Sequence, residues 1–547
     1  MKEKTKKTIN KKSVIFDILA IICIILFCIA ISPVTMQNDT YYTVKIGETI
    51  VQNGIDGMDH FSWHENLNYE YPHWLYDVMM YFIYNMGGWT GIYISTLVFT
   101  CLLGITLYIT SKKMCKNQIV PFVLTIASIF LIKSYIAARA QLVTFILFVL
   151  EVFFIEKFIK NRKIGYAVGL LSISLLIANL HVAVWPFFFV LFLPYIAEYL
   201  VCAIVDLDLI LKLKKLAYVI KKKIFFKNAE KIKIIEEKII SIDNQREKIK
   251  QRREENRKHP YKIKIERNKN IKYLILVMLI AALLGLCTPL GKTPYTYLID
   301  TMQGNTTKNI NEHLPLTLID QKDILGLLII VIALLMLTDI KIRLRDLFMF
   351  GGLVILTLMS RRQISMLILI GMPIYCKLIL AFFKKYKCMQ DVKKLLKEMT
   401  GVYGFCITLC VFVIVSTNMY KPKLDDKYVD ESSYPVQACD YILENLDISN
   451  MRIYNEYNYG SYMLYRGIPV FIDSRADLYT PEFNPGCTVF DDFLNIGTYY
   501  ENKFDEYNIT HVICFKNAKL NMFLSRNYEY KELYSDDRFI IYERDVE

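Results

Sequence analysis

The chain contains many apolar stretches that are each long enough to cross a bilayer as a helix. About 20 apolar residues span the roughly 30 Å hydrocarbon core. The first stretch follows a lysine-rich N-terminus and lacks a small-residue cleavage site, so we interpret it as a retained helix rather than a signal peptide. We therefore expect a mainly α-helical polytopic membrane protein. Its about eleven spans lie near residues 14–34, 89–110, 118–135, 140–157, 164–181, 183–205, 271–289, 323–340, 345–360, 363–383 and 399–419.

The charges are segregated along the chain. Residues 206–270 hold 21 Lys and Arg against 10 Asp and Glu, whereas residues 421–547 hold 13 against 23. Although the formal net charge is +13, this segregation is typical of a membrane protein whose basic and acidic segments lie on opposite sides of the bilayer, and not of a nucleic-acid-binding protein. If the spans alternate, 35–88 and 290–322 lie on one side of the membrane, and all the loops on the other side are basic. This arrangement predicts a cytoplasmic N-terminus and an extracytoplasmic C-terminal tail at the cell membrane.

Three segments are expected outside the bilayer: the loop 35–88, the insert 206–270 and the tail 420–547. The loop 35–88 has helical apolar spacing in both halves, which predicts two helices lying along the outer membrane surface. The insert 206–270 carries an isoleucine stripe (232, 235, 239, 242 and 249), which predicts a basic helical hairpin or short coiled coil near anionic lipid.

The tail 420–547 alternates helical patterns with short β-rich runs. These runs are 452–455, 470–473, 511–515, 528–534 and 539–543. The pattern predicts an extracytoplasmic α/β domain with a parallel core and a terminal hairpin. We therefore divide the chain into a transmembrane domain, 1–419, and a C-terminal domain, 420–547.

Charged and imidazole side chains recur where the expected helices meet the outer surface. Such groups are costly at membrane depth, so they carry a functional hypothesis. Arginines suit phosphate, which a guanidinium can bind with two hydrogen bonds, and an aspartate beside them can act as a general base. The set comprises Asp39, Arg139, His181, Glu312, His313, Arg361 and Arg362.

Simpler interpretations stand beside this hypothesis. Arg361 and Arg362 can flank the membrane, and Asp39 can cap an interfacial helix. His60, His64 and His73 share the first loop with acids, but their spacing fits no tight metal-ligand pattern.

The tail segment FIDSRADLY places Asp473, Arg475 and Asp477 at alternate positions after a β-rich run. These side chains form either a buried ion-pair cluster or a ligand contact at the end of a strand. The residues alone leave both interpretations open.

Several motifs resemble a bacterial family of multi-pass proteins within the GT-C glycosyltransferases, the superfamily of protein O-mannosyltransferases and aminoarabinose transferases. The likeness spans most of the chain outside 206–270. It rests on DTYYTVKIGETI, GIDGMDHFSWH, YPHWLYD, RAQLVTF, NLH, TPLG, NEHLP, RRQI, YNYGSY and VFIDSRADLY.

The resemblance implies a lipid-phosphate-linked sugar donor and a catalytic acid in the first outer loop, at the position of Asp39. Many members carry two acids there, whereas this chain has Asn38-Asp39. We therefore expect a base that requires no metal or other cofactor, although nothing in the sequence excludes a divalent ion.

The expected function is transfer of a sugar from a polyprenyl-phosphate-linked donor to a cell-envelope glycan or protein acceptor at the outer face. Arg139, Arg361 and Arg362 would bind the donor phosphate, while His181, Glu312 and His313 would orient the substrates. The alternative is a non-enzymatic transporter or flippase of lipid-linked sugars, or an assembly factor for envelope glycans. A transporter would be expected to show related halves with broken helices, and no clear internal repeat is found.

Overall fold

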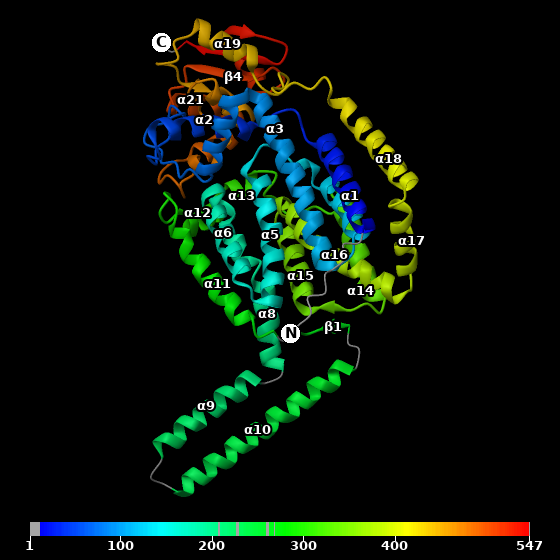
Figure 1. The fold of residues 1–547 in the computed structure, drawn as a ribbon. Helices are drawn as coiled ribbons and strands as arrows, with labels where there is room; N and C mark the ends of the chain where they lie inside the picture. Colours follow the sequence, from blue (N-terminus) through cyan, green and yellow to red (C-terminus); the bar gives the residue numbers. More distant parts are fainter. Residues whose placement is uncertain (1–10, 206–207, 226–228, 259–261, 267, 546–547) are drawn as a thin grey trace.

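The computed structural model describes residues 11–205, 208–225, 229–258, 262–266 and 268–545, and these are mainly α-helical. The long helices run beside one another in a bundle. The C-terminal region covers one end of this bundle, and a helical hairpin projects from the opposite end (Figure 1). Five described helical segments are long and apolar enough to cross a membrane: Lys11–Ile31, Trp74–Cys115, Val182–Cys202, Arg361–Lys385 and Val402–Lys423.

All eleven apolar stretches are largely helical. The stretch 183–205 is broken, because α7 ends at Val190 and α8 begins at Leu193. Pro194 has no N–H to donate and its ring clashes with the preceding turn, which favours a break in the helix at this point. The bundle helices are α1 Lys11–Ile31, α3 Trp74–Cys115, α4 Ile119–Leu131, α5 Ala140–Asn161, α6 Ile164–Leu180, α7 Trp185–Val190, α8 Leu193–Val205, α11 Ile271–Leu283, α14 Lys322–Leu337, α15 Leu344–Met359, α16 Ile364–Lys385 and α18 Val402–Tyr420.

The first loop forms the two helices expected in its two halves. Its first half is α2 (Asn38–Asn53), and its second half is the first part of α3, which begins at Trp74 and runs for 42 residues in all. A bend at Gly88, with φ of 57°, divides α3. Glycine adopts this positive φ readily, so one helix ends there and the next begins in a new direction without a loop between them.

The C-terminal region contains a four-stranded sheet covered by helices. The strand order is β3-β4-β6-β5, with β3 parallel to β4 and the other pairs antiparallel. The expected terminal hairpin is present, but 470–473 is not a strand, since Val470 forms only an isolated bridge to Ser62. The elements are β3 Ile453–Tyr454, β4 His511–Phe515, β5 Tyr530–Ser535, β6 Phe539–Arg544, α19 Val436–Asn445, α20 Tyr457–Tyr465, α21 Val489–Glu506 and α22 Lys519–Leu524.

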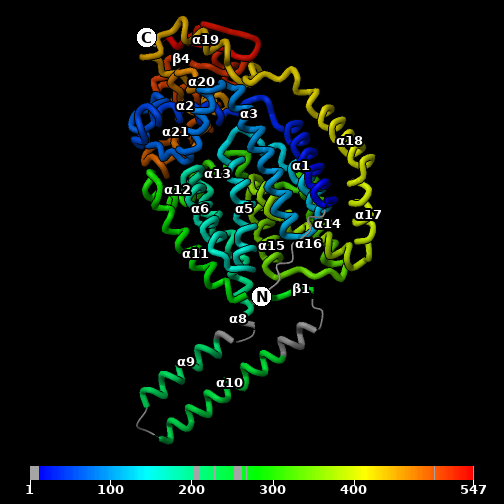
Figure 2. Tube along the Cα trace, viewed as in Figure 1, coloured from blue at the N-terminus to red at the C-terminus, as the bar shows by residue number. Residues whose placement is uncertain are grey.

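The first loop and the C-terminal region pack into one body (Figure 2). The Val470 N–H donates to the Phe61 carbonyl at 3.1 Å, and the Trp63 indole donates to the Ile453 carbonyl at 2.9 Å. The helix α2 packs against both α3 and α20. Backbone and side-chain bonds between distant segments therefore fix α2 over the end of the bundle.

The insert forms the expected helical hairpin, with α9 (Asp208–Ile224) beside α10 (Ala229–Lys258). The returning chain forms β1 (Ile263–Lys264), which pairs in parallel with β2 (Ile342–Arg343). Arg345 bonds Glu198 at 2.8 Å and Glu266 at 2.9 Å, so a buried guanidinium ties this segment to the bundle. The remaining helices are α12 Thr293–Gln303, α13 Thr306–Asn309 and α17 Met389–Met399.

Candidate active site

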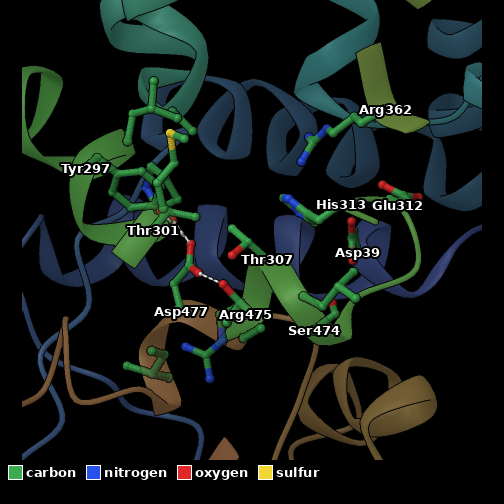
Figure 3. Close-up of a pocket in the computed structure, with 18 of the residues that line it drawn as sticks. Asp39, Tyr297, Thr301, Thr307, Glu312, His313, Arg362, Ser474, Arg475 and Asp477 are labelled. Atoms are coloured by element: carbon green, nitrogen blue, oxygen red, sulfur yellow. Dashed lines mark hydrogen bonds between the residues drawn. The ribbon is translucent and has the colours of Figure 1, made fainter. Parts of the chain in front are cut away.

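A cavity of about 710 Å³ lies between the bundle and the C-terminal region. Its walls come from segments that are far apart in the chain and that reach the same end of the bundle (Figures 1 and 3). Most residues expected at the site line it, together with two of the tail cluster: Asp39, Arg139, His181, Glu312, His313, Arg362, Arg475 and Asp477.

Asp39 reaches the cavity from the first turn of α2. The N-cap position is Gln37, and no side-chain cap is formed there, so Asp39 does not serve as the helix cap. A carboxylate in the first turn is favoured by the partial positive charge of the helix N-terminus. Asp39 Oδ2 lies 3.0 Å from Nε of Arg139, and no partner of Oδ1 is found among the described residues. One carboxylate oxygen therefore remains available to a ligand.

Arg139 bridges two acids. Besides contacting Asp39, it places Nη1 3.1 Å from Oε1 of Glu312. Burial opposes ionisation of Glu312, but the positive charges of Arg139 and Arg362 outweigh it and lower the pKa of this carboxyl. Arg139 thus orients Asp39 and Glu312, and its own charge is largely neutralised by them.

Arg361 and Arg362 are neighbours in the chain but face different surroundings. Arg361 donates from Nη2 to Thr317 Oγ1 at 2.7 Å and from Nε to the Pro315 carbonyl at 3.3 Å, and it does not line the cavity. Arg362 points into the cavity in Figure 3. No hydrogen-bond or ion-pair partner of its guanidinium is found among the described residues. Arg362, and not Arg361, is therefore the cation available to an anionic ligand.

Histidines form another part of the wall. Burial and the charge of Arg362 lower the pKa of His313 to about 4, so its ring is neutral near pH 7. His73 Nδ1 lies 2.9 Å from Oδ1 of Asp77, and its Nε2 lies 3.2 Å from the Tyr42 hydroxyl. The rings of His73 and His181 meet edge to face at 6.1 Å between their centres. A neutral imidazole, such as that of His313, can orient a sugar hydroxyl by donating or accepting one hydrogen bond.

The other first-loop histidines are engaged separately. His60 Nε2 lies 2.6 Å from Asp56 Oδ2, whereas His64 Nε2 lies 2.8 Å from the Phe471 carbonyl oxygen. Within the described residues, no three His, Cys, Asp or Glu side chains are grouped so that they could hold a metal ion.

The tail cluster is an ion-pair network that joins two parts of the chain. Arg475 bonds Asp473 through Nε at 2.9 Å and Nη2 at 2.7 Å, and Asp59 of the first loop through Nη1 at 2.6 Å. Asp477 instead accepts hydrogen bonds from hydroxyls, with Tyr297 at 2.9 Å and Thr301 at 3.2 Å. Burial raises the pKa of Asp477, and these hydroxyls counter the effect in part. The geometry favours the ion-pair interpretation for Asp473 and Arg475.

Sequence reasoning missed several polar residues of the cavity. Glu70 lines it with a buried Oε2 that has no hydrogen-bond partner among the described residues. Asn38 donates to the Tyr457 carbonyl at 3.1 Å, which joins α2 to α20 at the cavity wall. Isolated polar residues in loops form no periodic pattern, so only the pair Asn38-Asp39 offered a signal in the sequence.

One wall of the cavity is apolar. It is formed by short or terminal parts of α7, α12 and α15. Met302 and Met359 on this wall are 60% and 58% exposed, so the apolar surface continues to the outside of the bundle. The lining side chains on these elements are Phe187, Leu298, Met302, Leu356 and Met359.

No model of a known protein family matches the chain, and no curated protein matches it. The side chains of the cavity themselves indicate its chemistry. Among the described residues, it combines a carboxylate with one free oxygen, an unpaired guanidinium, the neutral ring of His313 and an apolar wall. This arrangement can hold an amphipathic anion and accept a proton from a hydroxyl beside it.

Proposed function

We propose that the chain is a membrane glycosyltransferase of the GT-C type. It takes a sugar from a polyprenyl-phosphate-linked donor and transfers it to a cell-envelope glycan or protein acceptor. The observation that carries the proposal is that Asp39 and Arg362, which has no partner among the described residues, face one cavity although 323 positions separate them. An acid and a free cation at one site are what hydroxyl activation and phosphate departure require.

The donor has a charged phosphate and an apolar polyprenyl chain, and the cavity has a charged part and an apolar part. The phosphate lies against Arg362, because a guanidinium forms charge-assisted hydrogen bonds with phosphate oxygens. The polyprenyl chain lies along the apolar wall and leaves past Met302 and Met359, which face the outside of the bundle. Because a cation and an apolar wall line the same cavity, a lipid phosphate fits it better than a free nucleotide sugar.

The reaction inverts the configuration at the donor sugar. Asp39 takes the proton of the acceptor hydroxyl while the hydroxyl oxygen forms a bond to C1 of the sugar. The bond from C1 to the phosphate oxygen breaks, and its electron pair leaves with polyprenyl phosphate. Arg362 stabilises the charge that develops on the leaving phosphate, which is most effective in a site with little water. Arg139 holds Asp39 in position, and Glu70, Glu312, His181 and His313 orient the sugar hydroxyls.

The membrane arrangement belongs to the same proposal. Residues 1–419 form the transmembrane domain, with the N-terminus and the basic insert 206–270 in the cytoplasm. Residues 420–547 form an extracytoplasmic domain that selects the acceptor, since Tyr457, Ser474 and Phe493 face the cavity from this region. The basic hairpin and the C-terminal region lie at opposite ends of the bundle, which supports this orientation (Figure 1).

A transporter has less support. A carrier binds its substrate near the middle of the membrane, between broken helices of two related halves. The cavity is instead built where helices end, at Arg139 before α5, His181 after α6 and Arg362 before α16.

The experiment that tests the proposal compares envelope glycans in a deletion strain that carries wild-type, Asp39→Asn or Glu48→Gln protein. Glu48 is the matched control, because it lies on the same helix but pairs with Lys45 at 2.7 Å and does not line the cavity. We expect Glu48→Gln to restore the wild-type glycan. Asp39→Asn should lower transfer by roughly 10²–10⁴-fold, the usual contribution of a general base. Full transfer by folded, membrane-inserted Asp39→Asn protein would refute the mechanism.

A further inference from the structure

The isoleucine stripe of α10 packs against α9 inside the hairpin. Ile235 and Ile242 are buried, and so is Leu211 of α9, which together mark the seam between the two helices. Lys215 pairs with Asp243 at 2.6 Å, and Lys222 pairs with Glu236 at 2.6 Å. The apolar pattern that the sequence showed on α10 is therefore satisfied by α9 and needs no further partner.

A second apolar stripe lies on the outside of α9. Leu213, Leu216, Ile220 and Ile224 are 58%, 56%, 50% and 65% exposed. Their spacing of three or four residues puts them on one side of the helix, and at 100° per residue this side is opposite Leu211 and the seam. Four large apolar side chains in one line thus face away from the rest of the hairpin.

Lysines border this stripe on both sides. At the same helical spacing, Lys214 and Lys221 lie along one edge of the stripe, and Lys223 lies along the other. A second copy of α9 on this stripe would set lysines against lysines, which repel one another. Anionic headgroups beside acyl chains are complementary to both the lysines and the stripe.

The place of α9 in the molecule agrees with this partner. In Figure 1, α9 lies on the bundle side of α10, close to the ends of α8 and α11. The base of the hairpin is held to the bundle by the β1–β2 pairing and by the Arg345–Glu266 bond at 2.9 Å. The stripe of α9, which lies opposite the seam, is therefore on the side of the hairpin away from α10, and the surface of a bilayer around the bundle would lie on this side.

We propose that α9 is an in-plane membrane anchor that binds anionic lipid. Leu213, Leu216, Ile220 and Ile224 enter the boundary between headgroups and acyl chains. The flanking lysines contact phosphate groups, and α10 holds α9 in position from the aqueous side. The anchor does not depend on the proposed reaction, since it needs only a bilayer around the bundle.

The test places an environment-sensitive fluorescent amino acid at position 216 of the full-length protein. A second protein carries it at position 237, an exposed site on α10, as the matched control. Each is reconstituted in nanodiscs of phosphatidylcholine alone or of phosphatidylcholine mixed with phosphatidylglycerol. We expect a blue-shifted emission for position 216 in the mixed lipid only, and no lipid-dependent shift for position 237. High salt should reduce the shift, because the lysine contacts are screened.

A charge-reversal variant separates the lysines from the apolar contact. Lys214→Glu/Lys221→Glu/Lys223→Glu should abolish the shift at position 216, whereas Lys233→Glu/Lys248→Glu on α10 should leave it unchanged. Equal emission in both lipids, or a shift that survives the charge reversal, would overturn the proposal. A shift in detergent that grows with protein concentration would identify a second copy as the partner and would overturn it too.

Discussion

The guanidinium of Arg475 lies 2.6 Å from the carboxylate of Asp59, although 416 positions separate the two residues in the chain. Their side chains are only 2% and 1% exposed. Asp473 and Asp59 share the positive charge, and the rings of Phe61 and Tyr69 lie within 5.3 Å and 5.1 Å of the guanidinium carbon. This contact fastens the first loop, and therefore α2 with Asp39, to the C-terminal region.

Removing one partner of this pair should loosen the whole cavity. Asp59→Ala leaves a buried guanidinium with less than its full charge compensation, and we expect a loss of about 3–5 kcal/mol in the free energy of unfolding. Differential scanning fluorimetry of the detergent-solubilised protein measures the effect as a lower melting temperature. Lys427→Ala is the control, since its pair with Glu431 is exposed and such pairs contribute about 0–1 kcal/mol. Equal melting temperatures for the two variants would contradict the buried role.

The two adjacent arginines give a matched comparison for phosphate binding. Arg362→Gln should weaken binding of a short-chain prenyl phosphate by roughly 10–150-fold, since a hydrogen bond to a charged group contributes about 1.5–3 kcal/mol. Arg361→Gln should change the affinity little, because Arg361 bonds Thr317 and Pro315 instead of facing the cavity. Isothermal titration calorimetry with purified protein checks both variants. A larger loss for Arg361→Gln than for Arg362→Gln would reverse the assignment.

The packing of α2 on α3 depends on the absence of a side chain at position 47. A Cβ at Gly47 would lie 2.1 Å from the Asp77 carbonyl oxygen and 2.8 Å from Cβ of Tyr81. Gly47→Ala should therefore push α2 away from α3, at a cost of about 1–3 kcal/mol in stability, and displace Asp39.

The control for this change is Gly165→Ala in α6, where no atom lies within 4 Å of an added Cβ. Alanine favours a helix over glycine by about 1 kcal/mol, so this variant should be neutral or stabilised. Thermal unfolding of both proteins gives the sign of each effect. Stabilisation by Gly47→Ala would show that α2 and α3 are not in close contact.

His64 should make the folded protein sensitive to acid. Burial lowers the pKa of this residue from 6.5 to about 4 in the folded state. Between pH 6.5 and about 4, His64 therefore binds a proton in the unfolded chain but not in the folded chain. The stabilisation is complete above pH 6.5 and is lost as the pH falls toward 4, by up to about 3 kcal/mol. Melting temperatures measured across this range should fall less steeply for His64→Gln than for the wild type; parallel profiles would exclude His64 as the cause.

The sequence predicted much of the local structure. Each apolar stretch is largely helical. A helix satisfies all the backbone hydrogen bonds within the segment itself, which an apolar stretch of about 20 residues needs in a bilayer. The hairpin at 208–258 and the terminal β-hairpin also follow from local periodicity. The helix expected in the second half of the first loop is present from Trp74 to the bend at Gly88. The strand expected at 470–473 is wrong, because Val470 pairs only with Ser62 of the distant first loop, and such a pairing leaves no local pattern.

The candidate site could be predicted in part. Asp39, Arg139, Glu312, His313 and Arg362 stood out as polar groups at the ends of apolar runs, and they do line one cavity. Nothing in the sequence separated Arg362 from Arg361, since the direction of a side chain in a short turn depends on its neighbours. Asp477 was identified, but its hydroxyl partners Tyr297 and Thr301 were not, because contacts between distant loops leave no local pattern.

The sequence by itself determined which segments are apolar helices and where the charged groups lie along them, because these properties depend on residues within a few turns of one another. Only the tertiary structure decided that Asp39 shares Arg139 with Glu312, that Arg362 has no partner within the described part of the chain, and that Arg475 joins the first loop to the C-terminal region. Such pairings depend on the packing of distant elements, which brings together side chains that no short-range pattern connects.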